Sequence, residues 1–209
     1  VYVSSRLFYC TFTNYFWSIP TYVVQMNNGL NWSTLSSSTV YTCPGFEVIQ
    51  DQVLLPDQSK TNFDHIVVPH SVAILPFISS EELIVIHEWK QSVGHLSYGV
   101  PSGTVESKDT TLFSAAKREL IEETGYTTDK ITPLTTIKFS SGFSNNTVSY
   151  FIAEMCSKSS DQHLDPDEFI ETSILNIRSL YQSILDGKIS DGKLITGVLF
   201  YLATRKGGF

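Results

Sequence analysis

Three glutamates, Glu119, Glu122 and Glu123, have the spacing of a metal-binding cluster. On a helix, positions i, i+3 and i+4 fall on one face, within an arc of about 100°. Like charges at i and i+4 repel by about 0.2 to 0.5 kcal/mol per pair in an isolated helix, so this face needs a positive partner. A hard divalent cation such as Mg²⁺ would serve, because it takes oxygen ligands and keeps waters and substrate phosphates in its shell.

The plain alternative is a solvated helix face, which is where most glutamates lie. A helix beginning at Leu112 turns an apolar sector toward the core and places Glu123 at the edge of that sector. A carboxylate in that position needs a partner. Arg118, four residues before Glu122, can hold one glutamate, but one guanidinium cannot neutralise three carboxylates. The pattern therefore favours a metal site.

The same residues resemble the Nudix box, the signature of the Nudix hydrolases. In that family a glycine-containing loop leads into a helix that carries Arg-Glu-aliphatic-x-Glu-Glu-x-Gly. This chain has the same order from Arg118 to Gly125, and Gly103 precedes it. Several fixed residue types at fixed spacing make the match far more specific than a lone glycine-rich loop.

The loop between Gly103 and Arg118 departs from the family pattern. The family has about thirteen residues there, one of them a glutamate, whereas this chain has fourteen residues. Asp109 or Thr110 stands in the place of that glutamate, depending on the end from which one counts. Both are also good N-cap residues. The departure bears on the geometry of the loop more than on metal binding.

The resemblance implies the Nudix fold, an α/β/α sandwich around a mixed β-sheet, with a small N-terminal β-domain. It also implies a Mg²⁺ site, with Mn²⁺ as the alternative ion. The implied ligands are Glu119, Glu122, Glu123 and the backbone carbonyl of Ser102. The metals would activate water and neutralise charge on a pyrophosphate. Glu122 and Arg118 would be catalytic residues, Arg118 by orienting a glutamate.

Glu168 matches the position of the general base in the ADP-ribose pyrophosphatases of this family. It lies in an acidic run, from Asp165 to Glu171, that precedes a helix expected around Ile177 to Leu185. The alternative is a solvated loop acid, because such loops are commonly acidic. If Glu168 is not the base, the next candidates are Asp165, Asp167 and Glu171.

The resemblance extends over about residues 39 to 206 and implies hydrolysis of a nucleoside diphosphate linked to another moiety. The substrate would be ADP-ribose, giving AMP and ribose 5-phosphate, or an ADP- or UDP-sugar. Ser141 stands where relatives that act on ADP-ribose usually carry proline, and Lys90 stands where many relatives carry arginine. A lysine in place of arginine cannot bind a phosphate in a bidentate manner. The sugar therefore stays open. The candidate substrate-binding residues are Lys90, Gly103, Gly142 and Phe143.

A second class of function is a Nudix-fold protein that binds nucleotides or regulates a partner without turnover. Such proteins typically lose glutamates of the box. All three glutamates are present in this chain, which favours an enzyme.

Runs of Val, Ile and Leu predict strands, and apolar periodicity predicts helices. We expect strands at residues 72–77, 83–89, 131–139 and 147–154, and helices from 112, at 177–185 and at 193–204. We divide the chain into an aromatic leader of uncertain status (1–38), a small β region (39–70) and the Nudix hydrolase domain (71–209).

Composition fits a cytoplasmic enzyme. Hydrophobic residues make up 42% of the 209 residues, enough for a sizeable core, and the net charge of −7 gives no footprint for nucleic acid or an anionic membrane. Cys10, Cys43 and Cys156 are odd in number and lack metal-ligand spacing, so we expect reduced thiols.

We expect the active unit to be a homodimer, because ADP-ribose pyrophosphatases of this family pair through an N-terminal β-domain. The strands around Thr39 to Leu55 form a unit too small to be stable alone, so they need a surface on which to pack. Trp32, Tyr41 or Phe46 would offer an aromatic face to the partner's nucleotide base.

Overall fold

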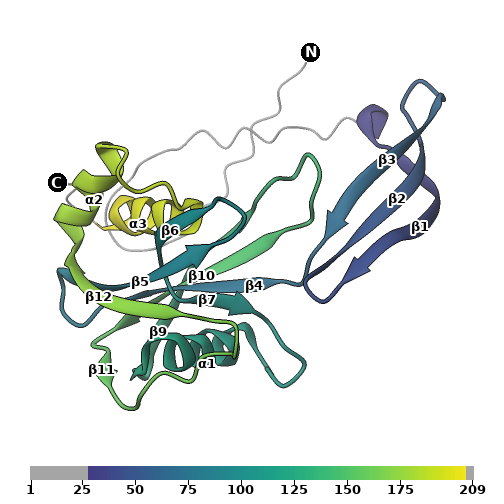
Figure 1. The fold of residues 1–209 in the computed structure, drawn as a ribbon. Coiled ribbons are helices and arrows are strands. Elements are labelled where there is room, and N and C mark those ends of the chain that lie inside the picture. The colour runs from purple at the N-terminus through teal and green to yellow at the C-terminus, as the bar shows by residue number, and fades with distance from the viewer. Residues whose placement is uncertain (1–27, 206–209) are drawn as a thin grey trace.

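The computed structural model describes residues 28–205. Residues 1–27 of the proposed leader, with Cys10, lie outside the described residues. A long three-stranded sheet extends from a larger body in which strands lie between helices (Figure 1). After the short 3₁₀ helix η1 (Asn28–Leu30), the long sheet is built from β1 (Ser33–Cys43), β2 (Phe46–Leu54) and β3 (Lys60–Val67).

The central sheet of the larger body has the strand order β7-β4-β10-β9. Its strands are β4 (Ser71–Pro76), β7 (Ser102–Thr104), β9 (Lys130–Lys138) and β10 (Thr147–Glu154). β4 and β10 run parallel, whereas β7 and β9 pair with them antiparallel. The sheet is therefore mixed, as the sequence predicted.

A second, antiparallel sheet has the order β12-β5-β6. Its strands are β5 (Glu82–Lys90), β6 (His95–Gly99) and β12 (Ile170–Asn176). A small ladder joins β8 (Tyr126–Thr127) to β11 (Ser157–Lys158). The helices are α1 (Leu112–Thr124), α2 (Ile177–Leu185) and α3 (Gly192–Thr204).

Alternating residues of β4 build two cores, one on each face of the sheet. Val72 and Ile74 pack with Leu120 of α1, while Ala73 and Leu75 pack on the other side with residues of α2 and α3. Both faces are covered, which is why β4 reads as a continuous apolar run. Figure 1 shows α1 on the opposite side of the strands from α2 and α3, so the predicted α/β/α sandwich is confirmed.

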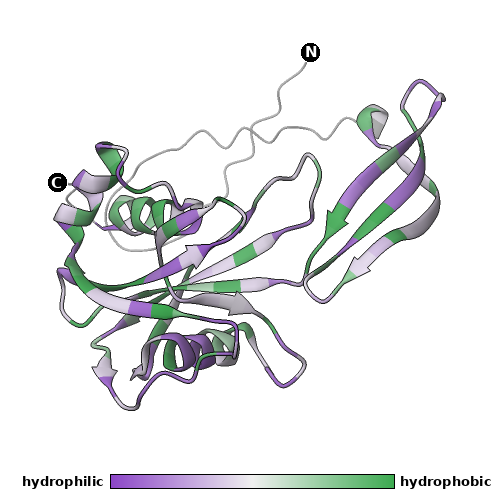
Figure 2. Cartoon of the chain, viewed as in Figure 1, coloured by the Kyte–Doolittle hydropathy of each residue, from purple (hydrophilic) through white to green (hydrophobic). Residues whose placement is uncertain are grey.

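The two helical layers differ in character. α3 is hydrophobic along most of its length, whereas α1 exposes a hydrophilic stripe (Figure 2). None of the helices in residues 28–205 combines the length and the apolar content needed to cross a membrane.

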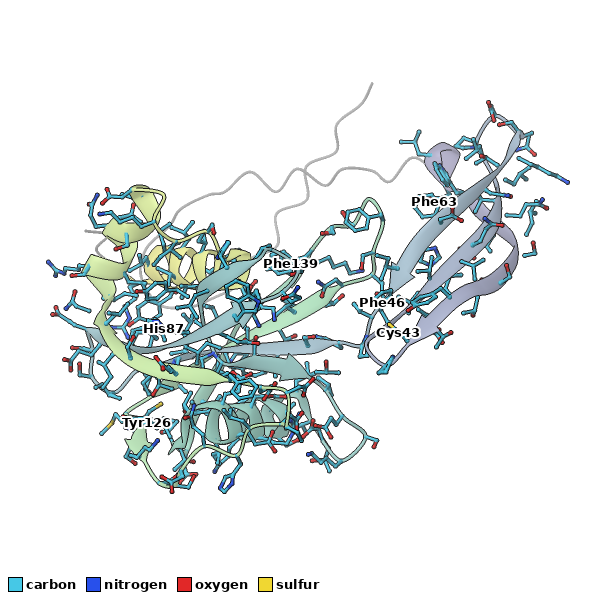
Figure 3. The ribbon with its side chains drawn as sticks, viewed as in Figure 1. Cys43, Phe46, Phe63, His87, Tyr126 and Phe139 are labelled. Atoms are coloured by element: carbon cyan, nitrogen blue, oxygen red, sulfur yellow. The ribbon has the colours of Figure 1, made fainter. Side chains whose placement is uncertain are left out.

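The long N-terminal sheet contributes little to the core. Of its described residues only Val53 is buried, and Phe46 and Phe63 lie near opposite ends of the sheet (Figure 3). β1 begins at Ser33, six residues before the boundary that the sequence suggested. At its base, the Ile66 amide donates to the Phe143 carbonyl at 2.8 Å, which ties β3 to the loop between β9 and β10.

The acidic run that contains Glu168 precedes α2, as the sequence predicted, but a strand that the sequence analysis did not predict lies between them. It leads into β12, which pairs antiparallel with β5 from Ile170↔Glu88 to Asn176↔Glu82. α2 follows only after that strand, with Asn176 as its N-cap. The consequence is that the acidic run is anchored to the edge of a sheet.

Candidate active site

α1 is fixed at both ends. The Thr111 hydroxyl accepts from the Ser114 amide, and the Ser114 side chain accepts from the Thr111 amide, so Thr111 is the N-cap. The expectation that Asp109 or Thr110 caps the helix was wrong. At the other end Gly125 has φ 70°, and a Cβ there would lie 2.3 Å from the Ser160 carbonyl oxygen. Glycine is therefore required at this turn.

β7 lies directly against the glutamates of α1. The Ser102 amide donates to Glu123 Oε2 at 3.1 Å. A Cβ on Gly103 would lie 2.1 Å from Glu119 Oε1, closer than any side-chain carbon tolerates. The glycine of the box is therefore required by the close approach of Glu119. Glu119 and Glu123 are buried, while the Glu122 side chain is 34% exposed.

The pKa values of the two buried carboxylates are raised. Burial raises the pKa of Glu123 to about 8, and repulsion from Glu119 adds to the effect. Burial likewise raises the pKa of Glu119, against the lowering effect of Arg118. The negative charge of Glu168 raises the pKa of both glutamates, so Glu168 faces the same cluster. A cation among these three carboxylates would relieve their repulsion.

Arg118 holds the cluster together. Its Nη1 donates to Glu119 Oε1 at 2.7 Å and to Glu122 Oε2 at 2.8 Å. Its Nε donates to Asp109 Oδ1 at 3.2 Å, and its Nη2 donates to Asp109 Oδ2 at 2.9 Å. Of the two loop residues considered in the sequence analysis, Asp109 rather than Thr110 therefore bonds Arg118, and Glu106 of the same loop also pairs with it at 3.2 Å. The guanidinium lowers the pKa of Asp109, whose side chain is only 4% exposed.

The donor set fits a hard cation. Carboxylate oxygens of Glu119, Glu122 and Glu123 lie on one helix face, and two of them are buried with raised pKa values. In the part of the chain that is described, no group of three or more His, Cys, Asp or Glu side chains is already placed to hold a metal ion. Arg118 bonds one oxygen of Glu119 and one oxygen of Glu122.

Glu168 lies beside a cavity of about 460 Å³. The cavity is lined by His87, Trp89, Leu96, Leu164, Glu168, Phe169, Ile170 and Glu171. The Glu168 carboxylate accepts from the Asp165 amide at 3.2 Å, which holds it within its own loop. Glu168 is partly buried, whereas Asp165, Asp167 and Glu171 are exposed. The site thus combines a carboxylate cluster with a largely apolar cavity.

The candidate substrate-binding residues separate into two groups. Gly103 lies in the site, and Lys90 forms an ion pair with Glu88 on β5. Gly142 and Phe143 lie in the loop that contacts β3. Among the described residues, no hydrogen bond or ion pair joins this pair to the glutamates.

The sequence analysis did not predict the contacts of two residues of the site. Asp109 was considered only as a loop acid or helix cap, and its bond to Arg118 depends on the path of the loop. Lys193, on α3, donates to Ser102 Oγ at 2.9 Å. It lies far outside the box in sequence, and no motif pointed to it.

Comparison with known proteins agrees with this geometry. Residues 68–196 match the model of the NUDIX domain. The chain is 26% identical over 165 residues to ADP-ribose pyrophosphatase of Bacillus subtilis (strain 168), covering 78% of this chain and 89% of that protein. It is 23% identical over 168 residues to methanol dehydrogenase activator of Bacillus methanolicus, covering 80% and 90%.

A solved structure shares the fold. The crystal structure of an ADP compounds hydrolase superposes with a TM-score of 0.71 at 17% identity, covering 81% of this chain and 91% of that chain. The match of the NUDIX domain spans more than half of this chain and includes all three glutamates of α1. The chain therefore belongs to the Nudix hydrolase family, and within it resembles the ADP-ribose pyrophosphatases.

Proposed function

We propose that this Nudix hydrolase cleaves the pyrophosphate bond of a nucleoside diphosphate linked to a sugar, with Mg²⁺ as its metal and Mn²⁺ as the alternative. ADP-ribose is the first candidate substrate, with AMP and ribose 5-phosphate as products. One observation carries the proposal, namely that Glu119 and Glu123 are buried together with raised pKa values and face Glu168. The likeness to ADP-ribose pyrophosphatase of Bacillus subtilis supports the choice of substrate.

Each residue of the cluster has a proposed role. Glu119, Glu122, Glu123 and the Ser102 carbonyl hold the metal, and Arg118 orients Glu119 and Glu122. A bound Mg²⁺ supplies an activated water and neutralises charge on the diphosphate. Glu168 accepts the proton of the attacking water as general base, because its charge is already directed at the cluster.

The substrate is proposed to lie between the carboxylates and the cavity. Lys90 and Gly103 border the diphosphate, while Trp89 and Phe169 offer aromatic faces to the base or the sugar. Gly142 and Phe143, whose loop is bonded to β3 of the N-terminal sheet, are proposed to contact the substrate of a partner subunit. The boundary between the β region and the hydrolase domain is proposed to lie near residue 70. Cys43 and Cys156 are free thiols, in keeping with the proposed cytoplasmic setting.

A panel of substrates tests this proposal. Purified protein is incubated with Mg²⁺ and ADP-ribose, ADP-glucose, UDP-glucose or a dinucleotide, and AMP, UMP and sugar phosphates are measured. We expect AMP from ADP-ribose at a rate that saturates with Mg²⁺. Release of no nucleoside monophosphate from any member of the panel would contradict the proposal.

A second candidate function is binding or regulation without turnover. The likeness to the protein named methanol dehydrogenase activator favours it. The two functions separate in one comparison, in which calorimetry measures binding of ADP-ribose and chromatography measures its cleavage in the same sample. Tight binding of intact ADP-ribose in the presence of Mg²⁺ would favour the regulatory function.

A further inference from the structure

Ser102 connects α1 to α3 through two different groups. Its amide donates to Glu123 Oε2 on α1, and its hydroxyl accepts from Lys193 Nζ on α3 at 2.9 Å. α1 and α3 lie on opposite sides of the strands, with β7 between them (Figure 1). Lys193 therefore approaches the site from the side opposite the glutamates.

The ammonium of Lys193 has unused hydrogen-bonding capacity. It carries three donors, and within residues 28–205 the bond to Ser102 is its one hydrogen bond to protein. No carboxylate in the same range lies within 4.0 Å of it, although the side chain is partly buried. A partly buried ammonium with free donors is costly unless a ligand satisfies it.

A second ammonium lies close by. Burial lowers the pKa of Lys193, and the positive charge of Lys90 is the next cause, whereas the negative charges of Asp191, Glu123 and Glu88 act in the opposite direction. Lys90 is already paired with Glu88, and Asp191 accepts from the Leu194 amide as the N-cap of α3. The two ammoniums repel each other, so an anion in direct contact with Lys193 would stabilise the arrangement.

The position of Lys193 indicates which anion. It bonds the same residue whose carbonyl is proposed to hold the metal, so an anion at Lys193 can also reach the metal cluster. A diphosphate has several oxygens of this kind, and an ammonium binds them as a point charge. The carboxylate of Glu123 acts on Lys193 by its charge but makes no ion pair with it within 4.0 Å, and its Oε2 accepts from the Ser102 amide instead.

We propose that Lys193 is a substrate-binding residue that donates to a non-bridging oxygen of the substrate diphosphate, from the side of the site opposite the glutamates. This inference rests on the proposed function, because it takes the ligand to be a nucleoside diphosphate sugar. It adds α3 to the elements that build the site.

The test compares three variants with the wild type. Lys193→Met removes the ammonium at similar volume, Lys193→Arg keeps the charge, and Lys188→Met is the control. Lys188 is exposed and paired with Asp186 at 2.9 Å, outside the site. Kinetics with ADP-ribose and Mg²⁺ give kcat and KM, and calorimetry with α,β-methylene-ADP-ribose gives a dissociation constant without turnover.

We expect Lys193→Met to raise KM and the dissociation constant of the analogue by about 10- to 100-fold, with kcat changed far less. Lys193→Arg should recover part of the affinity, and Lys188→Met should match the wild type. A fourth variant, Ser102→Ala, keeps the inference testable if Lys193→Met fails to fold. Ser102→Ala frees Lys193 without removing its charge, and should raise KM by a smaller factor.

Several results would overturn the inference. Unchanged KM and analogue affinity in Lys193→Met would show that the ammonium does not touch substrate. A lower melting temperature with unchanged affinity would assign Lys193 a purely structural role. Weaker Mg²⁺ binding with normal analogue binding would make it a counter-charge to the carboxylates. If the wild type neither cleaves nor binds the panel, the proposed function itself fails, and this inference fails with it.

Discussion

Arg118 is the residue on which the glutamates depend. It donates to Glu119 and Glu122 with one nitrogen and grips Asp109 with two others, so Asp109 sets the direction in which the guanidinium points. An aspartate is one carbon shorter than the family's glutamate.

Asp109→Asn should therefore lower stability. The Asn oxygen keeps one bond, and Arg118 retains its ion pairs with Glu106, Glu119 and Glu122. We therefore expect a loss of about 1 to 3 kcal/mol rather than the larger cost of a fully broken buried pair. Because Arg118 lowers the pKa of Asp109 below 3.8, its stabilising effect is complete above that pH and is lost as pH falls through the lower, folded-state pKa.

Melting curves between pH 3 and pH 7 measure this effect. The difference in melting temperature between wild type and Asp109→Asn should be largest at the neutral end and shrink below pH 3.8. Equal melting temperatures at pH 7, or a difference that stays constant to pH 3, would show that Asp109 does not hold Arg118.

Gly103→Ala should impair catalysis more than folding. The new Cβ would lie 2.1 Å from Glu119 Oε1, and the carboxylate can move aside because it ends a flexible side chain. A displacement of about 1 Å in a catalytic group costs roughly 10²-fold in rate. Turnover and melting temperature are measured together, with Gly45→Ala as control, since a Cβ at Gly45 meets nothing within 4 Å. Wild-type turnover in Gly103→Ala would contradict the proposed placement of Glu119.

At the scale of elements, β12 decides where Glu168 lies. The strand pairs with β5 along its whole length, and Glu168 precedes it by two residues. A loop anchored in this way holds its side chains more firmly than a free acidic loop. This makes Glu168, which is partly buried, a better general base than the exposed Asp165 or Asp167.

Glu168→Gln should lower kcat by about 10²-fold or more, because a neutral amide cannot accept the proton of the attacking water. Mg²⁺ affinity should change less, as Glu168 is not a proposed ligand. Asp167→Asn, in the same loop, is the matched control. If kcat is unaffected in Glu168→Gln and falls in Asp167→Asn, Glu171→Gln or Asp165→Asn instead, the base is another acid of the run.

The sequence predicted the elements whose signals are local. Continuous apolar runs located β4 and β5, and the box located α1, because burial on both faces and fixed spacing are visible in the residues themselves. β12 was missed because its pairing with β5 joins residues far apart in the chain. Its exposed positions also weaken the alternating pattern.

The candidate site shows the same limit. Glu119, Glu122 and Glu123 share one helix, so their common face could be predicted from spacing. The bond from Lys193 to Ser102 joins α3 to β7, and no local pattern encodes it. Contacts between distant elements depend on how the layers pack, which only the fold defines.

At the scale of the whole molecule, the sheet of β1, β2 and β3 is unusual in its exposure. Leu35, Val40 and Tyr41 on β1 are all exposed, and Trp32 packs edge-to-face on Phe63 with 5.7 Å between ring centroids. Monomers rarely leave such apolar surface uncovered, so a second copy of the chain is the proposed cover.

We predict a homodimer at micromolar concentration. Tyr41→Glu should shift the sedimentation coefficient toward the monomer and raise KM, because burying a charge in the interface is unfavourable. Ser37→Glu, on the same strand, is the control. A wild type that sediments as a monomer with full activity would rule the dimer out. So would a chain that begins at Val68, without the sheet, and has an unchanged KM.

The central claim is that the carboxylates of α1 hold a metal that drives cleavage of a diphosphate. The most direct test is the rate of AMP release from ADP-ribose as Mg²⁺ is titrated, for the wild type, Glu122→Gln, Glu123→Gln and the exposed control Glu154→Gln. A neutral amide is a poor ligand for a hard cation, so both site variants should lose about 10²-fold or more in rate.

Glu123→Gln should also melt no lower than the wild type without Mg²⁺, because it removes the repulsion from Glu119. Loss of the Mg²⁺-dependent rate with the fold intact, and a normal rate in Glu154→Gln, is the result that this account predicts. AMP release at the wild-type rate and with the wild-type Mg²⁺ dependence in both Glu122→Gln and Glu123→Gln would contradict it.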